Sequence, residues 1–247
     1  MKGIFCVFVL FFHFCFAKIY AQSIDFSLSG GANLLQQTNI EDYFSPTKSR
    51  YFVTPNLMSA IRYSFNEKLG LEAGAGWVYS YDNLGLKGNP LFPTGVGMVV
   101  RYRYGIISLP LSVHLTVLKK EKFRLETFFG GVYQVVRFGK NGEDYYRWGS
   151  LQKVIDGQLY TLNYTVGSIS FRDSFAVMSG FTSFFSINPR WKVFTKLALQ
   201  LGLSPISTNK FNFNLERQGT AIGEYRTIFK GDMVSFNVGM VYSFLLK

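Results

Sequence analysis

The sequence predicts an all-β protein: an eight-stranded antiparallel up-and-down transmembrane β-barrel with short periplasmic turns and long external loops. Two observations support this prediction. First, apolar and polar residues alternate with a period of two in eight segments after residue 22, which is typical of strands with one apolar face. Second, the connections between these segments are alternately short and long, as they are in transmembrane barrels.

The predicted strands have clear boundaries in most of the chain. They cover residues 24–35, 53–65, 69–81, 104–117, 123–138, 174–187, 191–203 and 233–246. Each is longer than the ~9–11 residues that a tilted membrane strand needs. The short turns are 66–68, 119–122 and 188–190, and the long connections are 36–50, 82–101, 139–172 and 204–230. The facing of the sixth strand stays ambiguous.

The last predicted strand, Met233 to Leu246, shows the alternation most fully. Between its ends, the odd positions Ser235, Asn237, Gly239 and Ser243 are small or polar, with Val241 as the exception. Its even positions are apolar or aromatic: Val234, Phe236, Val238, Met240, Tyr242 and Phe244. We expect this apolar face to contact lipid. We also expect the strand to pair with Ile24 to Leu35, which closes the barrel and removes both sheet edges.

Residues 1–21 have the pattern of a secretory signal peptide. Lys2 supplies a positive charge, and Ile4 to Phe16 is an apolar run. The small residue Ala21 precedes an expected cleavage before Gln22. The apolar run is too short to cross ~30 Å of hydrocarbon, which needs ~20 residues, so we expect a signal peptide rather than a membrane anchor.

The expected mature chain, 22–247, is one barrel domain. Both cysteines, Cys6 and Cys15, precede it, so disulfides and cysteine chemistry are excluded there. The net charge of the whole chain is +11, and removal of Lys2 and Lys18 leaves +9. For an exported protein this charge favours the lipid bilayer and lipopolysaccharide phosphates as partners, and not nucleic acid.

Asp156-Gly157 predicts a two-residue hairpin, because it lies between the apolar pairs Val154-Ile155 and Leu159-Tyr160. This hairpin could extend the fifth and sixth strands outside the membrane, or it could add two membrane strands and make ten. Residues 153–164 carry polar groups on both faces, which favours the external extension. A second hairpin is expected around Gln218-Gly219.

Charged residues recur on the face opposite the apolar one. They are Asp25, Arg62, Glu72, Arg124, Glu126, Lys192 and Lys196. On the lipid face, an Arg or Lys at the midplane would cost ~2–4 kcal/mol, so these residues should point inward. The interior of an eight-stranded barrel is just wide enough for side chains. We therefore expect a salt-bridged plug; the alternative is a proton or ion path.

Aromatic residues gather near the strand ends, where membrane barrels carry interfacial girdles. The set that predicts these girdles is Tyr63, Phe65, Trp77, Tyr79, Tyr81, Tyr102, Tyr104, Trp191, Tyr242 and Phe244.

His114, the only histidine after residue 22, is a candidate catalytic residue. Ser112 and Thr116 flank it on the same face, and Glu126 or Glu72 could complete an acyl-transfer triad. That face is the lumen, which lipid chains do not normally reach. We therefore expect no enzyme, no catalytic residues and no cofactor. With one histidine and no cysteine, we expect no metal site either.

The long connections are rich in basic and aromatic residues. These are Lys48, Arg50, Lys87, Arg101, Lys140, Arg147, Lys153, Arg172, Lys210, Arg217, Arg226 and Lys230, with Tyr43, Tyr145, Tyr146, Trp148 and Tyr225. They fit a surface for lipopolysaccharide or a protein partner, and equally a solvated rim beside anionic headgroups.

Four stretches resemble the PorT-like outer-membrane β-barrel proteins, which are related in shape to small OmpX- and OmpA-type barrels. They are Ala21-Gln22, Ile107-Ser108-Leu109-Pro110-Leu111, Phe128-Phe129-Gly130-Gly131 and Val238-Gly239-Met240-Val241-Tyr242-Ser243-Phe244. The resemblance implies an eight-stranded barrel in the outer membrane of a family mostly without known activity, some members being tied to protein secretion. It implies no catalytic residues. One departure is that Leu245-Leu246-Lys247 follow Phe244, where typical barrels end on an aromatic residue.

The function expected from these patterns is that of a non-enzymatic barrel in the cell outer membrane. It would present its basic-aromatic external loops, or act as an accessory of a larger outer-membrane assembly. The alternatives are a lipid-modifying enzyme that uses His114 and a narrow channel.

Overall fold

The computed structural model describes residues 23–41, 48–86, 98–136, 147–155, 158–217 and 219–245. These residues form twelve β-strands, all paired antiparallel. The predicted signal peptide, residues 1–21, lies outside them. No helix in the described ranges is long and apolar enough to cross a membrane.

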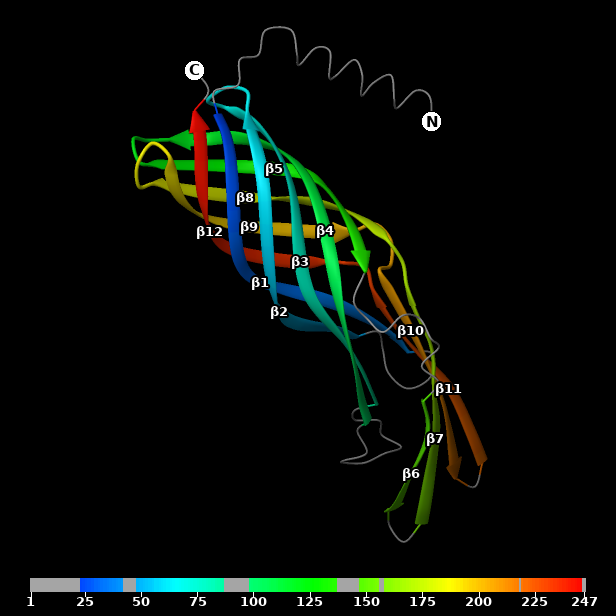
Figure 1. The fold of residues 1–247 in the computed structure, drawn as a ribbon. Helices are drawn as coiled ribbons and strands as arrows, with labels where there is room; N and C mark the ends of the chain where they lie inside the picture. Colours follow the sequence, from blue (N-terminus) through cyan, green and yellow to red (C-terminus); the bar gives the residue numbers. More distant parts are fainter. Residues whose placement is uncertain are drawn as a thin grey trace, which may run out of the picture.

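Eight strands form a closed barrel, as predicted (Figure 1). In order around the ring they are β1 (Ser23–Glu41), β2 (Lys48–Ser64), β3 (Leu69–Leu86), β4 (Met98–Lys119), β5 (Phe123–Val136), β8 (Ser174–Ser186), β9 (Trp191–Gly202) and β12 (Met233–Leu245). β12 pairs with β1 from Leu245 opposite Ser23 to Met233 opposite Leu35. This pairing confirms that the last strand closes the barrel on the first.

The other four strands form a sheet outside the ring, visible as the long extension in Figure 1. They are β6 (Arg147–Ile155), β7 (Gln158–Phe171), β10 (Ser207–Arg217) and β11 (Gly219–Phe229), paired in the order β11-β10-β7-β6. β11 joins this external sheet to the far end of β1, where Thr38 lies opposite Ile228. The β6–β7 hairpin is thus an external extension and not a pair of membrane strands; its turn, Asp156-Gly157, lies outside the described residues.

The predicted long loops were wrong in extent. Much of 36–50 and 82–101 is strand, since β1 reaches Glu41 and β3 reaches Leu86. Likewise, 139–172 and 204–230 contain β6, β7, β10 and β11. Beyond the membrane, both faces of a strand can meet water, so the sequence no longer has to alternate. Backbone pairing continues there without the pattern that reveals it.

The register sets the tilt of the strands. Each residue of the wall has a paired residue on the next strand. When these pairs are followed once around the barrel from Ser23 on β1, they lead back to β1 at Asn33, ten residues further on. The residues passed are Ser64, Gly70, His114, Phe128, Gly180, Ala198 and Ser235. A shift of ten residues over eight strands corresponds to a tilt of about 40°. The barrel is therefore narrow, and inward side chains from opposite walls meet.

The two faces of the wall agree with the predicted alternation. Outward residues such as Leu115 and Phe236 are 50% and 52% exposed, and the alternate inward positions are buried. Val241, the exception in the last strand, points inward and is buried. The ambiguous sixth strand is resolved as well: Phe181 faces outward and Phe184 inward. Phenylalanine on both faces is what hid its alternation.

Two of the three short turns have the same structure. Asn66 Oδ1 accepts hydrogen bonds from the backbone N–H groups of Lys68 and Leu69, each at 2.8 Å. Asn188 Oδ1 does the same for Arg190 at 2.9 Å and Trp191 at 2.8 Å. An asparagine side chain that bonds its own backbone two residues ahead stabilises a tight turn. Both hairpins therefore hold a basic residue at the same position.

At Gly130 on β5, the absence of a side chain lets the strand pack closely against the backbone of β4. A Cβ atom there would fall on the carbonyl oxygen of Leu111 and within 2.7 Å of the Cα atom of Ser112. The next residue, Gly131, has room, because the nearest atom to its Cβ would be the Ala176 carbonyl oxygen at 3.8 Å.

We expect Gly130→Ala to lower the free energy of unfolding by about 1–3 kcal/mol, the usual cost of inserting a methyl group where backbone must shift. Gly131→Ala is the matched control and should change stability little. Urea unfolding of the barrel in lipid vesicles, followed by tryptophan fluorescence, measures both. Equal effects of the two substitutions would contradict the close approach at Gly130.

Candidate functional site

The predicted charged residues all lie inside the barrel, in the half nearest the short turns. They occupy alternate positions near the turn ends of β1, β2, β3, β5 and β9. Asp25, Arg62, Glu72, Glu126 and Lys196 are buried, and Arg124 and Lys192 are partly buried. The structure thus brings the predicted set together as one cluster, which we call the lumen charge network.

The centre of the network is the pair formed by Arg62 and Glu126. Arg62 Nη2 donates to Glu126 Oε1 at 2.6 Å, and Arg62 Nη1 donates to Oε2. Glu126 is fully buried and also lies 3.0 Å from Arg124 Nε. Bidentate arginine–carboxylate contacts are among the strongest hydrogen bonds in proteins. Glu126 therefore anchors two arginines from different strands.

This pair spans the lumen instead of following the strand register. The residues opposite Arg62 on its neighbouring strands are Asp25 and Glu72, both carboxylates. Arg62 nevertheless bonds to Glu126 on β5, which is three strands away around the ring. Glu72 is then free to accept a 2.7 Å hydrogen bond from Lys196 Nζ on β9.

The remaining pair lies nearest the turns. Lys192 Nζ lies 3.7 Å from Asp25 Oδ2 and donates to Ser243 Oγ at 2.8 Å. Every charged residue of the predicted set is thus in an ion pair, and the pairs connect five of the eight barrel strands.

Aromatic rings complete the charged layer. The Arg124 guanidinium carbon lies 4.7 Å from the centroid of the Phe184 ring, and Lys196 Nζ lies 4.5 Å from that of Phe128. Cations placed over ring faces in this way are stabilised by the ring quadrupole. The sequence indicated these phenylalanines only as strand residues. Their role depends on which inward positions face each other across the lumen.

His114 is part of this network. Its ring is fully buried and stacks on Phe128, with ring centroids 5.2 Å apart. Nδ1 lies 3.2 Å from Glu126 Oε2, and Nε2 lies 3.1 Å from Ser112 Oγ. From the sequence, His114 is expected to point inward, but only a catalytic role is indicated for it. Its inward position between two carboxylate-bearing strands was the signal for the network role.

The half of the interior nearest the external sheet combines buried polar groups such as Gln134 and Asn237 with an apolar cluster, which the predicted polar plug did not include. Residues from four barrel strands meet two residues from the base of the external sheet there, and together they form an apolar cap. Its buried members are Leu35, Val78, Tyr104, Ile106, Ile206, Phe229 and Met233. The cap occupies the lumen at the end opposite the turns.

Two small cavities lie in the interior, of about 20 Å³ and 40 Å³. A cavity needs roughly 10–15 Å³ to hold one water molecule, so each has room for only a few. The smaller lies beside Asp25 and Arg62, and the larger beside Asn33 and Asn237. Lys196 lines both, so its side chain stands between them.

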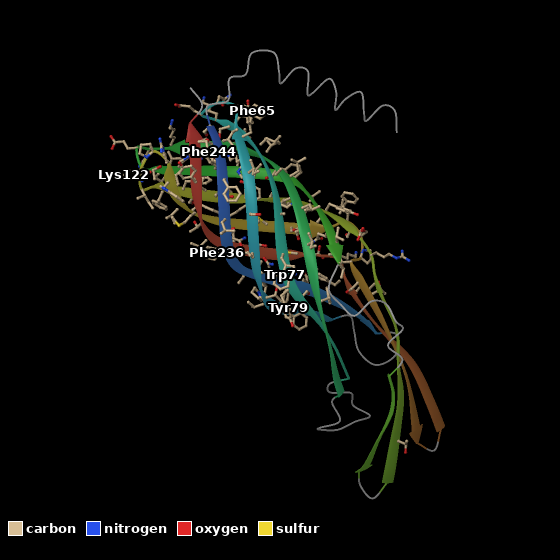
Figure 2. The ribbon with its side chains drawn as sticks, viewed as in Figure 1. Phe65, Trp77, Tyr79, Lys122, Phe236 and Phe244 are labelled. Atoms are coloured by element: carbon tan, nitrogen blue, oxygen red, sulfur yellow. The ribbon has the colours of Figure 1, made fainter. Side chains whose placement is uncertain are left out.

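The predicted interfacial aromatics lie near both ends of the wall (Figure 2). At the turn end, Tyr242 contacts both Trp191 and Phe244, with ring centroids 4.9 Å and 4.8 Å apart. Tyr63 packs on Phe65 in the same way, at 5.0 Å. Trp77 and Tyr79 lie toward the external sheet and contact each other at 6.3 Å. The side chains of Tyr81 and Tyr102 lie outside the described residues. The prediction was wrong for Tyr104, which points inward and is buried in the lumen.

Within the described part of the chain, no group of three or more histidines, cysteines or carboxylates is placed to hold a metal ion. Of the basic and aromatic loop residues, Arg172 and Lys230 are exposed. The other side chains of that set lie outside the described residues.

Comparison with known proteins places the fold. No protein-family model matches the sequence, and neither does any curated protein. Among solved structures, the chain resembles the outer membrane protein OprG from Pseudomonas aeruginosa, with a TM-score of 0.55 and 14% identity over 92% of this chain and 98% of that one. Weaker likenesses are to a major outer membrane protein from Thermus thermophilus, with a TM-score of 0.44 and 13% identity over 90% and 99% of the two chains, and to Ail of Yersinia pestis, with a TM-score of 0.34 and 14% identity over 90% and 99%.

The fold is therefore that of a small outer-membrane β-barrel. The closed ring, the apolar outer surface and the charged interior are the features of this class. The outer-membrane location predicted from the sequence agrees with it.

Arg62→Met should lower the free energy of unfolding by about 3–5 kcal/mol, because it leaves the buried carboxylate of Glu126 without its main partner. Lys119→Met is the matched control: it also removes a cation from an ion pair, but the Lys119–Glu67 pair is exposed, so little change is expected. Urea unfolding in vesicles measures both. The double variant Arg62→Met/Glu126→Gln should recover part of the loss, and failure of both expectations would show that the pair does not stabilise the barrel.

Proposed function

We propose that this protein is a non-enzymatic outer-membrane barrel that serves as a scaffold, and that it presents its external sheet to a larger outer-membrane assembly. The observation that carries the proposal is the continuous pairing of β11 with the end of β1, from Thr38 to Glu41. It joins a four-stranded sheet firmly to the barrel wall. A sheet held in this way is a fixed platform, whereas a flexible loop would have to be ordered on binding.

The resemblance to PorT-like barrels supports the same role. Some members of that family are tied to protein secretion, so a secretion assembly is the first partner to test. The external connections also carry most of the basic and aromatic residues outside the barrel, which suits lipopolysaccharide as well as a protein. Membership of that family is part of the proposal.

The filled lumen argues against a channel. The charge network fills the turn half, and the apolar cap fills the other half with Tyr104, Ile106 and Phe229 among its buried side chains. The two interior cavities among the described residues, of about 20 Å³ and 40 Å³, each hold only a few waters.

One arrangement favours an enzyme as the second candidate. Ser112 Oγ lies 3.1 Å from His114 Nε2, and His114 Nδ1 lies 3.2 Å from Glu126 Oε2. These contacts have the order and the hydrogen-bond distances of a Ser–His–carboxylate triad. All three side chains are buried, however, and the Glu126 carboxylate is already held by Arg62. A nucleophile must also be reached by its substrate. We therefore assign these residues to the interior network.

Trimming the external sheet should separate the scaffold role from barrel assembly. Residues 147, 166, 211 and 225 lie opposite one another across the four strands, so removal of 147–166 and 211–225 cuts the sheet along one line. We expect the trimmed protein to reach the outer membrane and keep heat-modifiable migration, while its native complex becomes smaller on blue native gels.

The matched control removes 83–101, the outer part of the β3–β4 ribbon above the Asp82–Tyr102 pair. It should leave the complex intact. If the wild-type barrel runs alone, or if both deletions alter the complex equally, the external sheet is not the scaffold surface.

Ser112→Ala tests the enzyme alternative. The substitution removes only a hydroxyl group, and we expect the acyl composition of outer-membrane lipids to stay unchanged when the variant replaces the wild type. Mass spectrometry of extracted lipids measures this. A changed acyl profile, with the barrel folded and at its normal abundance, would overturn the non-enzymatic reading.

A further inference from the structure

The turn end of the barrel carries a ring of exposed basic residues. The ring order places the three hairpin turns and the closing β12–β1 junction at four corners, a quarter of the circumference apart. The exposed basic residues of the three turns are Lys68, Lys119, Lys120, Lys122 and Arg190. Two acidic residues, Glu67 and Glu121, are exposed beside them. The surface around this mouth is therefore positive.

Part of this ring has a fixed geometry. Lys68 and Arg190 follow the two asparagine-stabilised turns, which lie on opposite sides of the ring. Lys119 is held by a 2.9 Å ion pair with Glu67, and its hydrogen bond and positive charge lower the pKa of the Glu67 carboxyl group. Lys122 lies at the third corner, on the turn labelled in Figure 2. The basic side chains thus project from all three turns.

Two further cations lie just inside the mouth. Arg124 and Lys192 are the second residues of β5 and β9, and their side chains are 20% and 15% exposed. They share this part of the lumen with Arg62, which bonds Glu126 through both terminal nitrogens. Three cations here face two carboxylates, Asp25 and Glu126. The floor of the mouth therefore has one positive charge in excess.

We propose that this mouth docks an acidic peptide segment of a periplasmic protein, with one carboxylate reaching Arg124 and Lys192. The proposal deepens the scaffold role proposed above, since it names the surface by which the barrel would join its assembly from the periplasmic side. The exposed ring steers the acidic segment toward the mouth, because like charges gathered around an opening focus its field.

A protein segment suits the mouth better than a phospholipid headgroup. Arg124 and Lys192 occupy inward positions, so the barrel wall separates them from the lipids that surround it. Both side chains are partly exposed at the mouth, so a carboxylate on a flexible stem can reach them there without entering the filled lumen. Lipid phosphates can reach the outer side of the turn lysines but not the floor.

The test measures binding of a fluorescein-labelled hexaglutamate peptide to the whole mature barrel in phosphatidylcholine nanodiscs, by fluorescence anisotropy. We expect Lys122→Glu/Arg190→Glu to weaken binding about tenfold or more, since it reverses two charges beside the mouth. The matched control, Arg172→Glu/Lys230→Glu, makes the same charge change at exposed positions on the opposite end and should weaken binding less than about twofold. Equal losses would mean that net charge alone attracts the peptide, which overturns the proposal.

Arg124→Gln tests whether the peptide contacts the cations inside the mouth as well as the exposed basic residues of the turns. It should weaken peptide binding about fivefold or more while the barrel keeps its heat-modifiable migration. Unchanged binding would place the peptide on the rim only and overturn the assigned contact. Phosphatidylglycerol nanodiscs test the lipid reading: if anionic lipid abolishes peptide binding to the wild type at constant ionic strength, the ring is a headgroup site. The peptide titrations use the isolated barrel and do not require the larger complex. If the peptide does not bind while the native complex is intact, the proposed peptide site is wrong and the proposed scaffold role is unaffected.

Discussion

Closure of the barrel is the constraint on which the rest of this structure depends. In lipid no water satisfies backbone N–H and C=O groups, so every strand of the wall must have a partner on both sides. The pairing of β12 with β1 over Ser23 to Leu35 meets this requirement, and the ten-residue shift that accompanies it makes the ring narrow and tilted. The narrowness in turn decides which inward side chains meet, and so creates the charge network.

The network shows how charged residues are kept inside such a wall. Taking charges out of water costs several kcal/mol for each ion, and the cost is recovered only when the partners and hydrogen bonds are complete. Glu126 achieves this with two arginines and a histidine, and Glu72 with Lys196. Because these contacts join strands across the lumen, they hold the ring at one diameter. The apolar cap does the same at the other end by packing.

The two ends of the barrel are unlike, and the proposed roles follow from that difference. One end continues into a four-stranded sheet that is joined to the wall by backbone pairing. The other ends in tight turns with exposed lysines and arginine around a cationic floor. The barrel between them carries two different surfaces at its two ends. That geometry suits a component that links external and periplasmic parts of an assembly.

The sequence by itself determined the eight membrane strands, the inward and outward faces of all but the sixth, the short turns and the inward position of every charge in the network. These follow from the period-two alternation that a wall between lipid and lumen imposes on each strand separately. Only the tertiary structure decided that Arg62 bonds Glu126 and not the carboxylates opposite it, that His114 joins them, and that strands continue beyond the membrane. Partner choice across the lumen depends on the register of all eight strands together, and a strand with water on both faces has no alternation to reveal it.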